Sequence, residues 1–102
     1  MYVIVWRFTT NDPLSFERHY GPDGVWAQLF RRSTEYVRTD LLKSTDGSYL
    51  TLDWWTSLDA YNRFRTEHAE DYALIDTASE SVTLFEDRLG EYLEMGSDPI
   101  YS

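Results

Sequence analysis

The sequence predicts one α+β domain whose strands and helices follow the order βαββαβ. Four runs rich in aromatic and β-branched residues are interspersed with two stretches in which apolar residues recur three or four positions apart. An Asp-Gly pair between the second and third runs predicts a tight hairpin. With 102 residues the chain is long enough for one core. We assign residues 1–95 to this domain and residues 96–102 to a flexible C-terminal tail.

The first strand is predicted over residues 2–10. Alternation places four bulky residues on one of its faces: Tyr2, Ile4, Trp6 and Phe8. Val3 and Val5 lie on the other face, together with Arg7. Because both faces are largely apolar, this strand is expected in the middle of a sheet.

The first helix is predicted to follow Asn11-Asp12-Pro13, which supplies a cap and a proline suited to a first helical turn. Two glycines and a proline within residues 21–24 should interrupt this helix. A helical stripe of apolar residues resumes at Val25 and reaches Phe30. We therefore expect one kinked helix.

The second and third strands are predicted over residues 36–43 and 48–55, joined by the hairpin at Asp46-Gly47. One face of the third strand carries Leu50, Leu52 and Trp54, and the other carries Tyr49, Thr51, Asp53 and Trp55. Ser57 can cap the second helix. The stripe of that helix, expected to face inward, consists of Tyr61, Phe64, His68, Tyr72 and Ile75. The last strand is predicted over residues 82–93.

Two βαβ halves joined by a hairpin make a ferredoxin-like fold, a four-stranded antiparallel sheet with two helices on one face. Two helices cover only one face of that sheet, although the strands carry bulky apolar residues on both faces. A second copy of the chain is the simplest cover for the other face. We therefore expect a homodimer, a dimeric α/β barrel, with a pocket between sheet and helices in each subunit.

Charge and composition exclude several classes of function. Nine basic against eighteen acidic residues give a net charge of −9, which should repel a nucleic acid. The chain has no cysteine, and we find no transmembrane run and no signal peptide in it. We expect a cytoplasmic protein with neither nucleic acid nor a membrane as partner.

The second helix supplies the catalytic candidates His68 and Tyr72, which are four residues apart, with Asp76 one turn further along. A histidine can relay a proton and a tyrosine can hold a phenolic or enolic oxygen, as oxidation of an activated aromatic ring requires. The alternative is that His68 packs with one satisfied nitrogen while Tyr72 fills the core.

Six further residues are candidates for substrate binding: Trp6, His19, Tyr20, Trp26, Arg38 and Phe64. His19, Tyr20 and Trp26 flank the break at residues 21–24, which could form the mouth of a pocket or simply let the chain bend. Arg7 and Arg38 should form ion pairs with carboxylates such as Asp53, Asp40 or Glu86. If Arg38 instead faces a cavity, it would favour an anionic substrate.

Motifs for metals and cofactors are missing from the sequence. Only two histidines are present, without His-x-x-x-His or Glu-x-x-His spacing, so we expect no metal. We find no Gly-x-Gly-x-x-Gly, Walker or Gly-x-Ser-x-Gly motif, so neither a nucleotide nor flavin cofactor bound by such motifs nor a serine hydrolase has support.

Three segments, residues 16–32, 49–76 and 86–92, resemble bacterial proteins of the antibiotic biosynthesis monooxygenase superfamily. The likeness rests on the Gly-Pro-Asp-Gly-x-Trp interruption at residues 21–26 and on Asp-x-Trp-x-Ser at residues 53–57. The resemblance implies a dimeric α/β barrel, and relatives include quinone-forming oxygenases that use no metal or flavin and haem-degrading monooxygenases. Haem degradation is disfavoured, because Trp6, Phe64 and Ala73 stand where haem degraders share Asn, Trp and His.

These observations favour a small-molecule monooxygenase that acts on an aromatic or quinol-like substrate, and the absence of cofactor motifs agrees with a reaction that uses no cofactor. The first alternative is a dimer that binds a small molecule or responds to stress without catalysis. The second is an isomerase or cyclase on the same fold.

Overall fold

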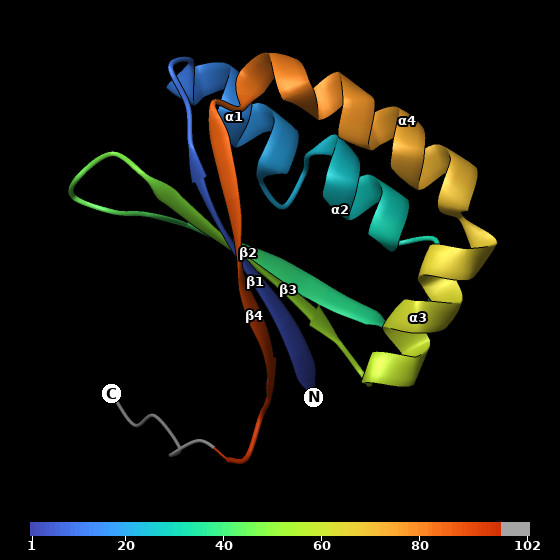
Figure 1. The fold of residues 1–102 in the computed structure, drawn as a ribbon. Coiled ribbons are helices and arrows are strands. Elements are labelled where there is room, and N and C mark those ends of the chain that lie inside the picture. The colour runs from blue at the N-terminus through green and yellow to red at the C-terminus, as the bar shows by residue number, and fades with distance from the viewer. Residues whose placement is uncertain (97–102) are drawn as a thin grey trace.

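The computed structural model describes residues 1–96, so the predicted tail lies outside the described residues except for Gly96. The four strands form one antiparallel sheet in the order β2-β3-β1-β4, with the helices together on one of its faces (Figure 1). The strands are β1 (Tyr2–Thr9), β2 (Tyr36–Lys43), β3 (Tyr49–Trp55) and β4 (Phe85–Leu93). The predicted ferredoxin-like α+β fold is confirmed, and β1 is central as expected.

Each predicted helix is divided in two. The helical segments are α1 (Pro13–Tyr20), α2 (Val25–Phe30), α3 (Leu58–Glu67) and α4 (Ala69–Ser79), with a 3₁₀ turn η1 (Glu80–Val82) after α4. In the first helix the expected kink is a complete break. At Gly24 the chain passes so close to the end of α1 that a Cβ atom would lie 2.2 Å from the carbonyl oxygen of His19. Only glycine fits that approach.

The second break falls at His68, where the expectation of one continuous helix is wrong. His68 has φ −118° and ψ 29°, outside the helical region, and its backbone N–H donates to the carbonyl of Phe64 at 2.9 Å. The side chain of Arg65 spans the break, because it donates to the Tyr61 hydroxyl at 3.0 Å and stacks on the Tyr72 ring. His68 and Tyr72 therefore do not share one helical stripe.

Local signals in the sequence locate most of the other boundaries. The side chain of Asp12 caps α1, with Pro13 in the first turn, and the side chain of Ser57 caps α3. The second strand has the predicted bounds, while the last strand begins at Phe85 because residues 80–82 form η1 instead.

The core between the sheet and the helices is built largely from aromatic rings. Phe16 and Trp55 are fully buried, and Tyr20 packs on Phe16 at 4.4 Å and on Phe8 at 4.6 Å between ring centroids. Such aromatic pairs stabilise the fold beyond the area that they bury. They also fix α1 over the end of β1, which positions Tyr20 at the edge of the pocket described below.

The opposite face of the sheet carries the predicted second set of bulky residues. In the strand register Val5 lies opposite Leu52, and Val3 lies between Trp54 and Tyr92, so all five side chains share this face. The Tyr92 side chain is 53% exposed in the single chain. No helix within residues 1–96 is long and apolar enough to cross a membrane.

Candidate functional site

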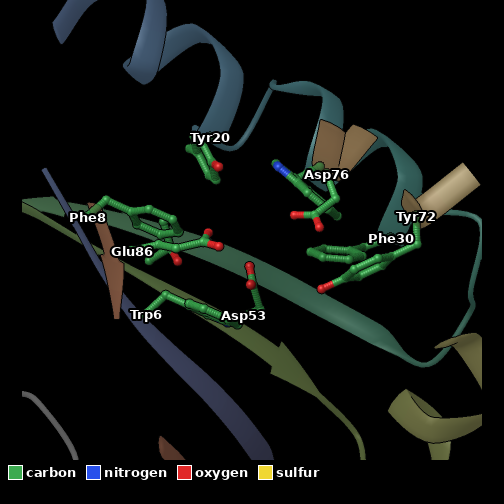
Figure 2. Close-up of a pocket in the computed structure, with 10 residues that line it drawn as sticks. Trp6, Phe8, Tyr20, Phe30, Asp53, Tyr72, Asp76 and Glu86 are labelled. Atoms are coloured by element: carbon green, nitrogen blue, oxygen red, sulfur yellow. The ribbon is translucent and has the colours of Figure 1, made fainter. Parts of the chain in front are cut away.

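A pocket lies between the sheet and the helices. Its inner chamber has a volume of about 50 Å³ and is lined by six aromatic residues, one threonine and three acids: Trp6, Phe8, Tyr20, Trp26, Phe30, Tyr72, Thr51, Asp53, Asp76 and Glu86. Figure 2 shows the carboxylates of Asp53, Asp76 and Glu86 and the hydroxyl of Tyr72 pointing into the same space. The chamber thus combines apolar walls with a few convergent polar groups, as ligand sites usually do.

An outer chamber of about 190 Å³ adjoins the inner one, because Tyr20, Asp76 and Glu86 line both. The outer chamber is completed by residues around the start of β4: Ser79, Glu80, Thr83 and Leu84. The inner chamber is small beside the roughly 300 to 1,000 Å³ of pockets for drug-sized ligands. A ligand larger than a few atoms therefore has to extend from the inner chamber into the outer one.

Asp53 is the acid on the floor of the pocket. The alternation of β3 points it toward the helices, on the face that also carries Thr51 and Trp55. Its Oδ1 accepts a hydrogen bond from the Thr39 hydroxyl at 2.7 Å. Burial raises the pKa of Asp53 to about 6, and the nearby charge of Asp40 acts in the same direction. A carboxylate with this pKa can accept a proton near neutral pH.

Tyr72 forms the side wall and presents its hydroxyl to the pocket (Figure 2). Its ring meets the Trp26 ring edge-on at 4.8 Å, and the Arg65 guanidinium lies 3.8 Å from its centroid. Burial raises the pKa of the Tyr72 hydroxyl above its ordinary value. The hydroxyl therefore keeps its proton at neutral pH and is available as a hydrogen-bond donor.

Ser79 holds the upper wall in place from behind. Its hydroxyl donates to the Ile75 carbonyl at 2.7 Å and accepts from Trp26 Nε1 at 2.9 Å, and His19 Nε2 lies 2.7 Å away. The one proton of the Ser79 hydroxyl goes to the Ile75 carbonyl, so the Ser79 oxygen must accept a hydrogen bond from His19. The neutral His19 ring therefore carries its proton on Nε2. Burial lowers the pKa of His19, which favours its neutral form. Ser79 is thus a structural anchor for Trp26 rather than a nucleophile.

The mouth of the pocket is acidic. Asp76 projects from α4 and Glu86 from β4, with Glu80 beside them in the outer chamber. Burial raises the pKa of Glu86, and the charges of Asp76 and Glu80 add to the rise. Of the ion pairs formed within residues 1–96, none involves these three acids or Asp53.

The structure brings together half of the predicted site residues. Trp6, Tyr20, Trp26 and Tyr72 line the inner chamber. His19 lies one layer behind it, bonded to Ser79.

The other three predicted residues lie elsewhere. His68 sits at the break between α3 and α4 with its ring 4.8 Å from that of Phe64, which is itself core. Arg38 pairs with Asp40 at 3.2 Å and lies over the Trp54 ring, on the sheet face away from the helices, so it does not face this cavity. Of the ion pairs expected for the two arginines, Arg38 with Asp40 is confirmed, whereas Arg7 pairs with Asp46 instead.

Asp53 and Glu86 are the functional candidates that the sequence did not reveal as pocket residues. Asp53 alternates with Thr51 and Trp55 on a buried face, which is the signal that could have identified it. Glu86 becomes visible only through the register that pairs it with Phe8. Within the described part of the chain, no three His, Cys, Asp or Glu side chains are arranged to hold a metal ion.

Solved structures of similar fold include oxygenases. SnoaB, a cofactor-independent oxygenase from Streptomyces nogalater, is 25% identical, covers 97% of both chains and has a TM-score of 0.78. The ActVA-Orf6 monooxygenase from Streptomyces coelicolor, solved with the ligand nanaomycin D, is 17% identical over 98% of this chain and 92% of that one, with a TM-score of 0.73. A Deinococcus radiodurans protein assigned to the antibiotic biosynthesis monooxygenases is 13% identical over the whole of both chains, also with a TM-score of 0.73.

A dimeric ferredoxin-like protein from an uncultured marine organism matches at 10% identity over 99% of this chain and 92% of that one, with a TM-score of 0.59. No protein-family model matches the chain, and no curated protein matches it.

Proposed function

We propose that the chain is a member of the antibiotic biosynthesis monooxygenase superfamily and a monooxygenase of an aromatic, quinol-like substrate that needs no cofactor. The observation that carries this proposal is that Asp53 and Tyr72 both point into one aromatic pocket (Figure 2). One group accepts a proton near neutral pH, and the other donates a hydrogen bond. The likeness to a cofactor-independent oxygenase supports the proposal.

The two residues fit the oxidation of an anthrone-like methylene to a carbonyl. Asp53 removes a proton from the ring carbon, and the Tyr72 hydroxyl stabilises the phenolate or enolate oxygen that gains charge. The electron-rich anion then reduces O2 and forms a carbon–oxygen bond, giving a hydroperoxide once a proton is added. Loss of water from the hydroperoxide leaves the ketone, so one oxygen atom enters the product and the other leaves as water. Asp53 returns the proton that it took when the peroxide anion is protonated, and the loss of water needs no further proton because the remaining C–H proton leaves with the hydroxide.

Oxygen uptake with anthrones and hydroquinones tests the proposal. The wild type should consume one O2 per product and increase the rate above autoxidation. Asp53→Asn should lower kcat/KM by about 100-fold or more, as loss of a general base does. Tyr72→Phe should lower it less. Asp40→Asn, which removes a carboxylate from the opposite face of the sheet, should keep the activity at pH 7.5, where Asp53 is ionised with or without the charge of Asp40.

The pH dependence provides a second readout of the same proposal. Because Asp53 must be ionised, the enzymatic rate should rise with pH through about 6 and level off above it. Uptake that never exceeds the uncatalysed rate would leave the pocket as a binding site without oxygenation. Isomerised or cyclised product formed without O2 consumption would instead favour the isomerase or cyclase alternative.

A homodimer and a cytoplasmic location complete the proposed function. The apolar sheet face around Leu52, Trp54 and Tyr92 supports a second copy as its cover, and the dimeric ferredoxin-like protein offers a precedent. Light scattering at micromolar concentration should give twice the chain mass of 12.1 kDa. A monomer at that concentration would contradict the dimer.

A further inference from the structure

The charge of the pocket is one-sided. Four carboxylates line its two chambers, from Asp53, Asp76, Glu80 and Glu86, and no lysine, arginine or histidine is among the described residues that line either chamber. The side chains of Asp76, Glu80 and Glu86 take part in no hydrogen bond or ion pair within residues 1–96, so their charge is free to act on a ligand. An anionic ligand would meet repulsion from all four acids.

Two cations stand near these acids, but neither lines one of the two chambers. Arg65 lies over the Tyr72 ring and donates to the hydroxyl of Tyr61, and its charge also interacts with that of Asp76. Arg88, which lies opposite Trp6 in the sheet, is bound to Glu91 at 3.3 Å. Two arginines therefore stand near the pocket, but each is held by other side chains and neither lines it.

The aromatic walls favour a cation as well. Six rings surround the inner chamber, and indole and phenol faces attract ammonium groups that lie within about 6 Å. Arg65 over the Tyr72 ring shows this attraction within the protein itself. Among the described residues, the three acids that point into the chamber are not grouped as metal ligands would be.

We propose that the pocket selects aromatic molecules that carry a positively charged amino group over neutral or anionic ones of the same shape. This proposal rests on the proposed function in one respect only, namely that this pocket is the site where the ligand binds. The aromatic part would lie against Trp6, Trp26 and Tyr72 and extend past Tyr20 into the outer chamber. The ammonium group would lie between Asp76 and Glu86, which line both chambers.

Three naphthalene probes that differ only in the charge of one substituent test this inference. They are 2-naphthylmethylamine, which is protonated at neutral pH, 2-naphthalenemethanol and 2-naphthoate. Calorimetric titration at 150 mM salt should show the amine binding at least about tenfold more tightly than the alcohol, with the carboxylate weakest. The moderate salt concentration screens the diffuse effect of the net charge of −9 but acts less on groups within the pocket.

Two variants separate the pocket acids from the overall charge. The double variant Asp76→Asn/Glu86→Gln should bring the affinities of the amine and the alcohol to within about twofold of each other. Glu70→Gln/Asp71→Asn alters the same number of charges at the start of α4, outside both chambers, and should keep the preference. Circular dichroism should show the native fold in both.

Several outcomes would overturn the inference. These are equal affinity for the three probes, tighter binding of the carboxylate, no binding of the amine at millimolar concentration, and a preference that persists in the Asp76→Asn/Glu86→Gln protein. The result is independent of the oxygen-uptake assay. Charge selectivity without uptake would refute the monooxygenase proposal alone, whereas uptake without charge selectivity would refute only the choice of ligand.

Discussion

Replacing Asp53 by Asn should make the protein more stable at neutral pH, although it removes a hydrogen-bonded acid from the site. The reason is that the folded chain holds the Asp53 carboxylate where ionisation is unfavourable, so its pKa is about 6 instead of the 3.8 that is usual for a solvent-exposed aspartate. Above pH 6 the acid is charged in both the folded and the unfolded chain, and the folded chain bears the desolvation cost. An amide has no such cost and keeps an oxygen for the Thr39 hydroxyl.

The size and sign of the effect follow from the shift of about two pKa units. Each unit corresponds to about 1.4 kcal/mol, so the ionised carboxylate costs about 3 kcal/mol at pH 7.5 as an order of magnitude. As pH falls through 6, the folded chain takes up the proton first, and the cost drops to about 1 kcal/mol at pH 4.5. The gain in the variant should therefore be largest at high pH and nearly absent at pH 3.

Urea unfolding of the wild type and Asp53→Asn at pH 7.5 and pH 4.5, at one protein concentration, measures the difference. Asp40→Asn is the matched control, because it also removes one carboxylate from the sheet, but one held by Arg38 and by Trp54 Nε1. It should give no gain. A loss of stability in Asp53→Asn at pH 7.5, or a gain of equal size at both pH values, would refute the reasoning about burial.

Three further predictions concern the fold. Gly24→Ala should lower the free energy of unfolding by about 2 kcal/mol or more, because the added Cβ would lie 2.2 Å from the His19 carbonyl oxygen. A melting temperature equal to that of the wild type would contradict this close approach. Hydrogen bonds from Ser48 lower the pKa of Asp46 to about 2, so the ionised carboxylate stabilises the hairpin above pH 4 and this contribution is lost as pH falls toward 2. Asp46→Asn should therefore have a lower melting temperature at pH 7, and its melting temperature should change less between pH 4 and pH 2 than that of the wild type. Leu52→Lys should give a folded monomer by light scattering, and an unchanged dimer would locate the interface elsewhere.

Much of the fold could be predicted because its signals are local. The Asp46-Gly47 turn, the caps Asp12 and Ser57 and the alternation of β3 each depend on a few neighbouring residues. The break at His68 could not be predicted in this way, because residues 66–70 contain neither glycine nor proline. Contacts between separate helices, such as Arg65 with the ring of Tyr72, accompany that break and appear only in three dimensions.

The pocket was predicted less well than the fold, and the misses have a common cause. Bulk and periodicity mark the inward face that carries Trp6 and Tyr72, and the break at residues 21–24 points to Tyr20 and Trp26. The acids Asp53 and Glu86 were interpreted as partners for arginines, since a buried charge usually has a counter-ion. Which acids go unpaired depends on the strand register and on where each arginine finds its partner, and no local pattern contains that information.

Stability and function make opposite demands on Asp53, and this opposition is itself evidence about its role. An acid that costs about 3 kcal/mol when ionised has no place in a pocket whose only purpose is to fill the core, because an amide or an apolar residue would serve better. If Asp53→Asn is more stable and also loses oxygen uptake, the carboxylate is there for chemistry. If the variant is more stable and binds 2-naphthylmethylamine more weakly without affecting turnover, the carboxylate is there for the charge of the ligand. A variant that gains stability and keeps both properties would show that Asp53 has neither role, and the base would have to be sought among the other acids of the pocket, with Glu86 first because burial also raises its pKa.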